Sequence, residues 1–271
     1  MSAMDCSNIT RETLKRLFVE GKRFDGRGLS DYRDFNISFN VSNKAEGSAR
    51  VKIGKTEVVV GVKMEVGKPY ADSPEKGNLT VSGDLLPMAS PRFEAGPPKF
   101  NAIELPRLVD RAIRHSGILD LKQLVITPGE KVWTVIIDIY PINDDGNIID
   151  AATIGAAAAL RKAMVPVLNE KGEIDYHQES KTPLPISKEI FPMIITFFRL
   201  GDSIILDPTR EEEEACEARI AWGVSKWEGQ YMINSCQKGE EIPLTRQHIE
   251  YMMDIIPKKF DEASEKLKKF F

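Results

Sequence analysis

Cysteine and histidine are scarce in this sequence. It has three of each in 271 residues, and Cys6, Cys216 and Cys236 are an odd, widely scattered set. This spacing excludes the paired cysteines of a typical zinc site and gives no basis for a structural disulfide. We therefore expect a reduced, cytoplasmic protein without a metal and without another cofactor.

Long apolar runs and a strong charge of one sign are also absent. No apolar run reaches the roughly 18 residues that a membrane-spanning helix needs, and the N-terminus lacks a signal-peptide pattern, so no membrane partner is expected. The formal net charge is −4, with 29% charged and 42% apolar residues. This balance argues against a protein that grips nucleic acid over its whole surface, but it does not exclude a local basic patch.

Apolar periodicity predicts strands followed by helices in both halves of the chain. Alternation over 32–66 indicates consecutive strands, and helical spacing returns at 103–113 and 151–167. The second half repeats this outline, with a C-terminal helix that Thr245 caps, so the predicted class is α+β. We expect three parts: an N-terminal helix within 1–22 that Thr10 caps, a first domain over 23–180, and a second domain over 189–271 with C-terminal helices.

The segment 207–219 is the most distinctive local pattern. It begins with Asp207, continues through four glutamates at 211–214, and ends at Arg219, after which apolar alternation resumes. We interpret it as a strand end, an acidic turn and a new strand. Consecutive glutamates on a turn favour a solvated face over a metal site.

Several motifs, in this order along the chain, resemble the RNase PH family of phosphate-dependent 3′-to-5′ exoribonucleases. They are the Arg23–Arg27 turn, the helix from Glu104, the strand from Trp133, Asp145-Gly146 before an alanine-rich helix, and the acidic segment. The resemblance implies two β-sheet/helix halves, the first similar to the ribosomal protein S5 domain 2-like fold. Length, the N-terminal helix and the phrase from Leu124 to Gly129 resemble the non-catalytic branch of the archaeal exosome, in which such subunits alternate with a catalytic sister in a hexameric ring.

Two departures from the active members of this family remove their chemistry. The resemblance places Ile148, Ile149 and Asp150 in a run that binds phosphate in active members through a hydroxyl and a guanidinium. Asp150 would repel phosphate, and we expect it to cap the helix from Ala151 instead. The resemblance also places Arg219 where active members have an essential aspartate; a guanidinium stays protonated and is neither an acid nor a base. We therefore predict no catalytic residue, and an ion pair of Arg219 with Glu217 or with a partner's carboxylate.

Three arginines remain as candidates for RNA binding. Arg107, Arg111 and Arg114 stand at i, i+4 and i+7 of a predicted helix, a stripe about 60° wide that can bracket successive phosphates of one strand. The spacings from Glu104 to Arg107 and from Asp110 to Arg114 also suit helical salt bridges, worth about 0.2 to 0.5 kcal/mol each. The resemblance favours RNA binding by Arg107 and Arg111, with Arg114 nearer a subunit interface. Arg23 and Arg27 either touch RNA or pin the N-terminus, and we expect pinning.

The leading hypothesis is a non-catalytic, RNA-binding ring subunit. Its partners would be the catalytic RNase PH-like subunit in a trimer of heterodimers, RNA-binding cap proteins, and single-stranded RNA for 3′-to-5′ phosphorolysis. The chain would also help to shape the active site of its sister. Two alternatives stay open: a chain that itself phosphorolyses RNA with Asp207 or one of the four glutamates, and a purely architectural subunit.

Overall fold

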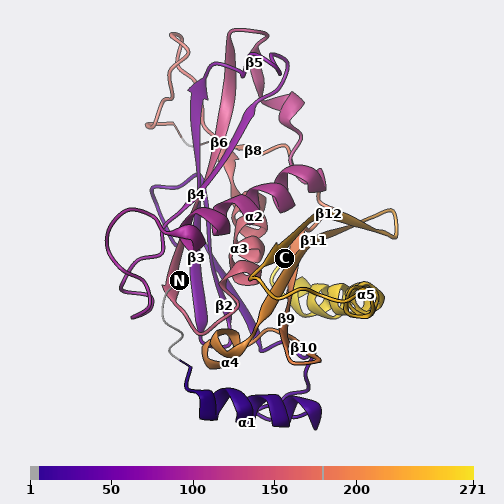
Figure 1. Cartoon of the computed structure of the whole chain (residues 1–271). Coiled ribbons are helices and arrows are strands. Elements are labelled where there is room, and N and C mark those ends of the chain that lie inside the picture. Colours follow the sequence, from indigo (N-terminus) through magenta and orange to yellow (C-terminus); the bar gives the residue numbers. More distant parts are fainter. Residues whose placement is uncertain (1–5, 179) are drawn as a thin grey trace.

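Two β-sheets and the helices between and beside them make up the fold (Figure 1). The structure is a computed structural model, and it describes residues 6–178 and 180–271. Residues 1–5 of the predicted N-terminal segment therefore lie outside the described residues. The predicted α+β class is confirmed.

The first sheet has the strand order β1-β2-β3-β6-β4, and β5 pairs with β6. Neighbouring strands are antiparallel except β4 and β6, which run parallel. Alternate residues of β3, among them Val58, Val60 and Val62, are fully buried, as the sequence alternation predicts. The strands are β1 (Phe35–Phe39), β2 (Gly47–Ile53), β3 (Thr56–Gly67), β4 (Asn78–Gly83), β5 (Val125–Thr127) and β6 (Lys131–Asn143).

The second sheet is antiparallel with the order β10-β9-β11-β12. Its strands are β9 (Met193–Leu200), β10 (Ser203–Leu206), β11 (Ala218–Trp227) and β12 (Gln230–Gly239). The connection between the halves adds a two-stranded pair, β7 (Met164–Val165) with β8 (Thr182–Pro183).

Helices α2 and α3 join the two sheets. The alanine-rich α3 (Ile148–Lys162) packs against β2 and β3 on one side and β9 on the other, while α2 (Phe100–Ser116) contacts α3, β4, β11 and β12. Gly155 allows α3 to approach the first sheet closely, because a Cβ there would lie 2.7 Å from Cγ2 of Val60. The remaining helices are α1 (Asn8–Val19), the 3-10 helix Leu121–Leu124, α4 (Arg210–Ala215) and α5 (Arg246–Lys268), which packs on β9.

Local details correct three of the sequence predictions. Ser7, not Thr10, caps α1, since its hydroxyl accepts a hydrogen bond from the Thr10 amide. The acidic segment is not a turn but the helix α4, closed by a reciprocal capping box between Thr209 and Glu212. Within the described part of the chain, the C-terminal region is one continuous helix, α5, rather than several. Thr245 caps α5 as predicted.

Candidate functional site

The three arginines predicted to bind RNA lie on one exposed face of α2. Arg107, Arg111 and Arg114 line a shallow groove of about 400 Å³ between α2 and β4. The other lining residues are Tyr70, Leu79, Thr80, Val81, Pro106 and Asp110. The structure thus brings all three predicted side chains to one surface.

Their hydrogen-bonding states differ. Arg114 donates to both carboxylate oxygens of Asp110, at 3.0 and 2.6 Å, and to a backbone carbonyl of β4. The hydrogen bond that Arg114 donates to Asp110 raises the pKa of Arg114 above its usual value. Arg111 donates to the side chain of Gln237 at 3.0 Å. No hydrogen bond or ion pair joins Arg107 to any residue that the structure describes, so Arg107 is the most available cation of the three.

Arg219 is bound to the same helix. Its Nη2 lies 2.6 Å from Oε2 of Glu104, and the two side chains are only 14% and 10% exposed. The predicted pairing with Glu217 is wrong, because Glu217 faces the backbone amide of Gly201 instead. The alternative salt bridge from Glu104 to Arg107 does not form: Oε2 of Glu104 is bound to Arg219, and its Oε1 is buried without a hydrogen-bond partner among the residues that the structure describes.

At the N-terminus of α3, the side chains of Ile148 and Ile149 offer neither a hydroxyl nor a cation. Ile148 is buried and Ile149 is half-buried, and both pack against the apolar core. The residue before the helix is Asn147, in the left-handed region at φ 57°, and Asp150 lies one turn inside the helix. The prediction that Asp150 caps this helix is therefore wrong: the helix starts three residues earlier, and the Asp150 side chain points into the domain joint.

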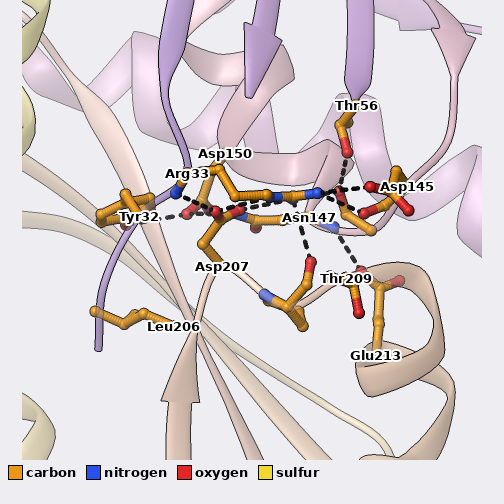
Figure 2. Close-up of polar contacts among 12 residues, drawn as sticks. Tyr32, Arg33, Thr56, Asp145, Asn147, Asp150, Leu206, Asp207, Thr209 and Glu213 are labelled. Carbon is orange, nitrogen blue, oxygen red and sulfur yellow. Dashed lines mark hydrogen bonds and ion pairs between the residues drawn. The ribbon is translucent and has the colours of Figure 1, made fainter. Parts of the chain in front are cut away.

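Asp150 is fully buried among hydrogen-bond donors. It accepts a bond from the Thr196 hydroxyl at 2.6 Å. It also accepts bonds from Asn147 and Tyr32, both at 3.2 Å (Figure 2). Burial raises the pKa of its carboxyl to about 7, although the bonds from Thr196 and Asn147 act in the opposite direction. The nearby charge of Asp207 adds to the increase.

Asp207 lies at the centre of the polar contacts between the two sheets (Figure 2). Its carboxylate accepts three bonds from Arg33: the backbone amide at 2.8 Å, Nε at 2.9 Å and Nη2 at 2.8 Å. Asn147 donates at 2.9 Å and Arg27 at 3.1 Å. Burial alone would raise the pKa of Asp207, but the bonds and charge of Arg33 lower it, so the carboxylate stays ionised. A carboxylate held by five donors is not free to act as a base.

Arg23 and the acidic helix form a second buried contact. The guanidinium of Arg23 donates to Glu212 and to the backbone carbonyls of Leu206 and Asp207. This confirms that Arg23 pins the N-terminal segment. The prediction of a solvated glutamate face is wrong for Glu212, whose side chain is 1% exposed, and for Glu213, which accepts the Asn147 amide at 2.7 Å.

The combined arrangement joins the two halves of the chain through hydrogen bonds and ion pairs between buried or partly buried side chains. Sequence patterns gave no signal for the roles of Arg33, Asn147 and Thr196, because their partners lie tens to more than a hundred residues away in the chain. Among residues 6–178 and 180–271, no group of three or more His, Cys, Asp or Glu side chains is placed to hold a metal ion. No helix in these ranges has the length and apolarity to cross a membrane.

Comparisons with known proteins show the family to which the chain is similar. Residues 31–166 match the 3′ exoribonuclease family, domain 1, and residues 191–255 match domain 2 of the same family. Exosome complex component Rrp42 of Methanothermobacter thermautotrophicus is 43% identical over 96% of this chain and 95% of the relative. The protein of the same description from Thermococcus onnurineus is 44% identical over 98% and 97%.

Solved structures agree with these relatives. A chain of the Archaeoglobus fulgidus exosome with RNA bound to the active site superposes with a TM-score of 0.87 at 38% identity, covering 96% of this chain and 98% of the other. A chain of an archaeal exosome core gives 0.84 at 36% identity, covering 96% and 97%. The family predicted from the sequence motifs is confirmed: the chain belongs to the RNase PH family of 3′ exoribonucleases and contains both of the family's domains.

Proposed function

We propose that this chain is a non-catalytic, RNA-binding subunit of a cytoplasmic archaeal-type exosome. It would alternate with a catalytic RNase PH-like subunit in a hexameric ring, a trimer of heterodimers, and would guide single-stranded RNA to that subunit for 3′-to-5′ phosphorolysis. RNA-binding cap proteins are further proposed partners. The name that the relatives carry, exosome complex component Rrp42, supports the assignment to an exosome.

One observation carries the non-catalytic part of the proposal. The position that holds the essential aspartate in active members is occupied by Arg219, and this guanidinium is bound to Glu104. Phosphorolysis needs an anion site and a group that manages a proton on the departing 3′ oxygen. The start of α3 offers neither a hydroxyl nor a cation from Ile148 and Ile149, while the exposed arginines of α2 suit a phosphate backbone.

The catalytic assignment is tested by phosphate-dependent shortening of a labelled single-stranded RNA. We expect no shortening by the purified chain alone and strong phosphorolysis when it is mixed with the catalytic RNase PH-like subunit, because the chemical groups belong to that partner. Phosphate-dependent shortening by the chain alone would support the alternative, a subunit that is itself an active exoribonuclease. A contaminating nuclease is recognised by activity that persists without phosphate.

The RNA-binding assignment is tested by charge reversal on α2. In the reconstituted ring, Arg107→Glu with Arg111→Glu should weaken binding of single-stranded RNA by about 20-fold at 0.1 M salt. Each lost phosphate contact lowers the slope of log K against log salt by about 0.7, so two lost contacts lower K by about 20-fold at 0.1 M salt relative to 1 M. Fluorescence anisotropy with a labelled oligonucleotide measures the affinity.

A matched control uses two exposed cations of α5. Arg246→Glu with Lys258→Glu changes the net charge by the same amount at side chains that are 89% and 75% exposed. This variant should bind RNA as the wild type does. If wild type and the α2 variant bind single-stranded RNA equally well in an intact ring, the chain is a purely architectural subunit.

A further inference from the structure

Glu104 and Arg107 are placed to form a salt bridge, yet the bridge is absent. They stand three residues apart on α2, a spacing at which a carboxylate and a guanidinium on a helix surface normally attract each other. Instead, the carboxylate of Glu104 turns to β11 and binds Arg219 at 2.6 Å. Arg107 consequently remains exposed and without a partner among the described residues.

The second sheet is shaped to receive Arg219. Arg219 on β11 pairs with Gly239 on β12, and its guanidinium lies over that glycine so closely that a Cβ at position 239 would overlap it. The same strand β12 provides Gln237, which accepts a hydrogen bond from Arg111. Two contacts from neighbouring strands therefore fix the exposed face of α2.

We propose that Arg219 is a positioning residue for RNA binding: it holds Glu104 against β11, away from Arg107, and so keeps the Arg107 guanidinium available to an RNA phosphate. The inference deepens the proposed function and depends on it. The residue that replaces the catalytic aspartate of active relatives thereby has a task of its own on the RNA-binding helix.

The physical consequence of losing Arg219 follows from charge. A released Glu104 has Arg107 as its neighbour at helical spacing, and a carboxylate there both neutralises the guanidinium and repels an approaching phosphate. Arg219→Gln should therefore remove up to one phosphate contact. This amounts to about fivefold weaker binding of single-stranded RNA at 0.1 M salt and a slope of log K against log salt that is smaller by about 0.7.

The experiment compares five variants in the ring reconstituted with the catalytic RNase PH-like subunit. They are Arg219→Gln, Glu104→Gln, Arg107→Gln, Arg219→Gln with Glu104→Gln, and Arg219→Gln with Arg107→Gln. A labelled single-stranded oligonucleotide is titrated at several salt concentrations, and the mass of each ring is checked by light scattering. Arg246→Gln, which breaks an exposed ion pair on α5, is the matched control.

Rescue separates the proposed role from a merely structural one. We expect Arg219→Gln and Arg107→Gln each to weaken binding, Glu104→Gln to bind as wild type does, and Glu104→Gln to restore the affinity of Arg219→Gln. Adding Arg219→Gln to Arg107→Gln should have no further effect. If Arg219 had only a structural role, Glu104→Gln would not restore RNA affinity, because the double variant at 104 and 219 still lacks the ion pair.

Three results would overturn the inference. If Arg107→Gln weakens binding but Arg219→Gln does not, or if Glu104→Gln fails to rescue, the inference is wrong and the proposed function stands. If Arg107→Gln binds as wild type does, the RNA-binding role of Arg107 is wrong and the inference falls with it. If the ring with Arg219→Gln does not assemble, the RNA affinity of the Glu104→Gln ring tests the proposal. Weaker RNA binding by Glu104→Gln would contradict it.

Discussion

Replacing Arg23 with methionine is expected to lower the free energy of unfolding by about 3 to 5 kcal/mol. The side chains of Arg23 and Glu212 are 0% and 1% exposed, so the substitution leaves a buried carboxylate without its counter-charge. It also removes the donors to two backbone carbonyls at the end of β10. Urea unfolding followed by circular dichroism measures the loss.

The double variant Arg23→Met with Glu212→Met distinguishes burial of an unpaired charge from loss of packing. Replacing both charges of a buried pair by apolar groups is often close to neutral, so the second substitution should recover much of the stability. The neighbouring Lys22→Met is the control, because its ion pair with Glu20 is exposed and worth at most about 1 kcal/mol. Equal losses for Arg23→Met and Lys22→Met would contradict the buried-pair interpretation.

Asp150→Asn is expected to change how stability depends on pH. The folded-state pKa of Asp150, about 7, lies above its ordinary value of 3.8, so the folded protein binds this proton more tightly than the unfolded chain does. The contribution of Asp150 to stability therefore falls as pH rises from about 4 to about 7. Between pH 5 and pH 8 the wild type should lose about 2 to 3 kcal/mol relative to the asparagine variant.

Urea unfolding of both proteins at pH 5 and pH 8 gives this difference, and the comparison with the variant cancels the titration of all other groups. The groups that face Asp150 are Tyr32, Asn147, Thr196 and Asp207. Asp202→Asn is the control, since this carboxylate is fully exposed. A stability difference between Asp150→Asn and wild type that stays constant with pH would show that Asp150 is ionised throughout.

Periodicity and capping rules predict the elements of this fold better than its contacts. The strands over 32–66, the helix α2 and the Thr245 cap follow from patterns within a few residues, and all three are present. The helix α4 has a readable signal in the sequence: Thr209 followed by Glu212 is a capping box, which the adjacent run of glutamates obscures. The mistaken cap at Asp150 has a different cause, since Asn147 starts α3 from a left-handed conformation that sequence spacing does not reveal.

The polar contacts of the candidate site were beyond sequence reasoning. Arg23 pairs with Glu212, 189 residues away in the chain, and Arg219 pairs with Glu104, 115 residues away. Such pairs depend on how elements far apart in the sequence pack together, as α2 does against β11. A local spacing rule points to other partners, as the mistaken pairing with Glu217 shows. The α2 arginines were placed on one face correctly because helical periodicity alone determines that face.

The position of Asp207 has a consequence for how this subunit responds to its surroundings. The five donors around its carboxylate would suit a free anion, but here the negative charge is part of the chain and is therefore present at a high effective concentration. A dissolved phosphate or sulfate ion has to compete with a tethered counter-ion that never diffuses away. Because of this tethered charge, we expect the contacts between the two domains to stay the same whatever the anion content of the medium.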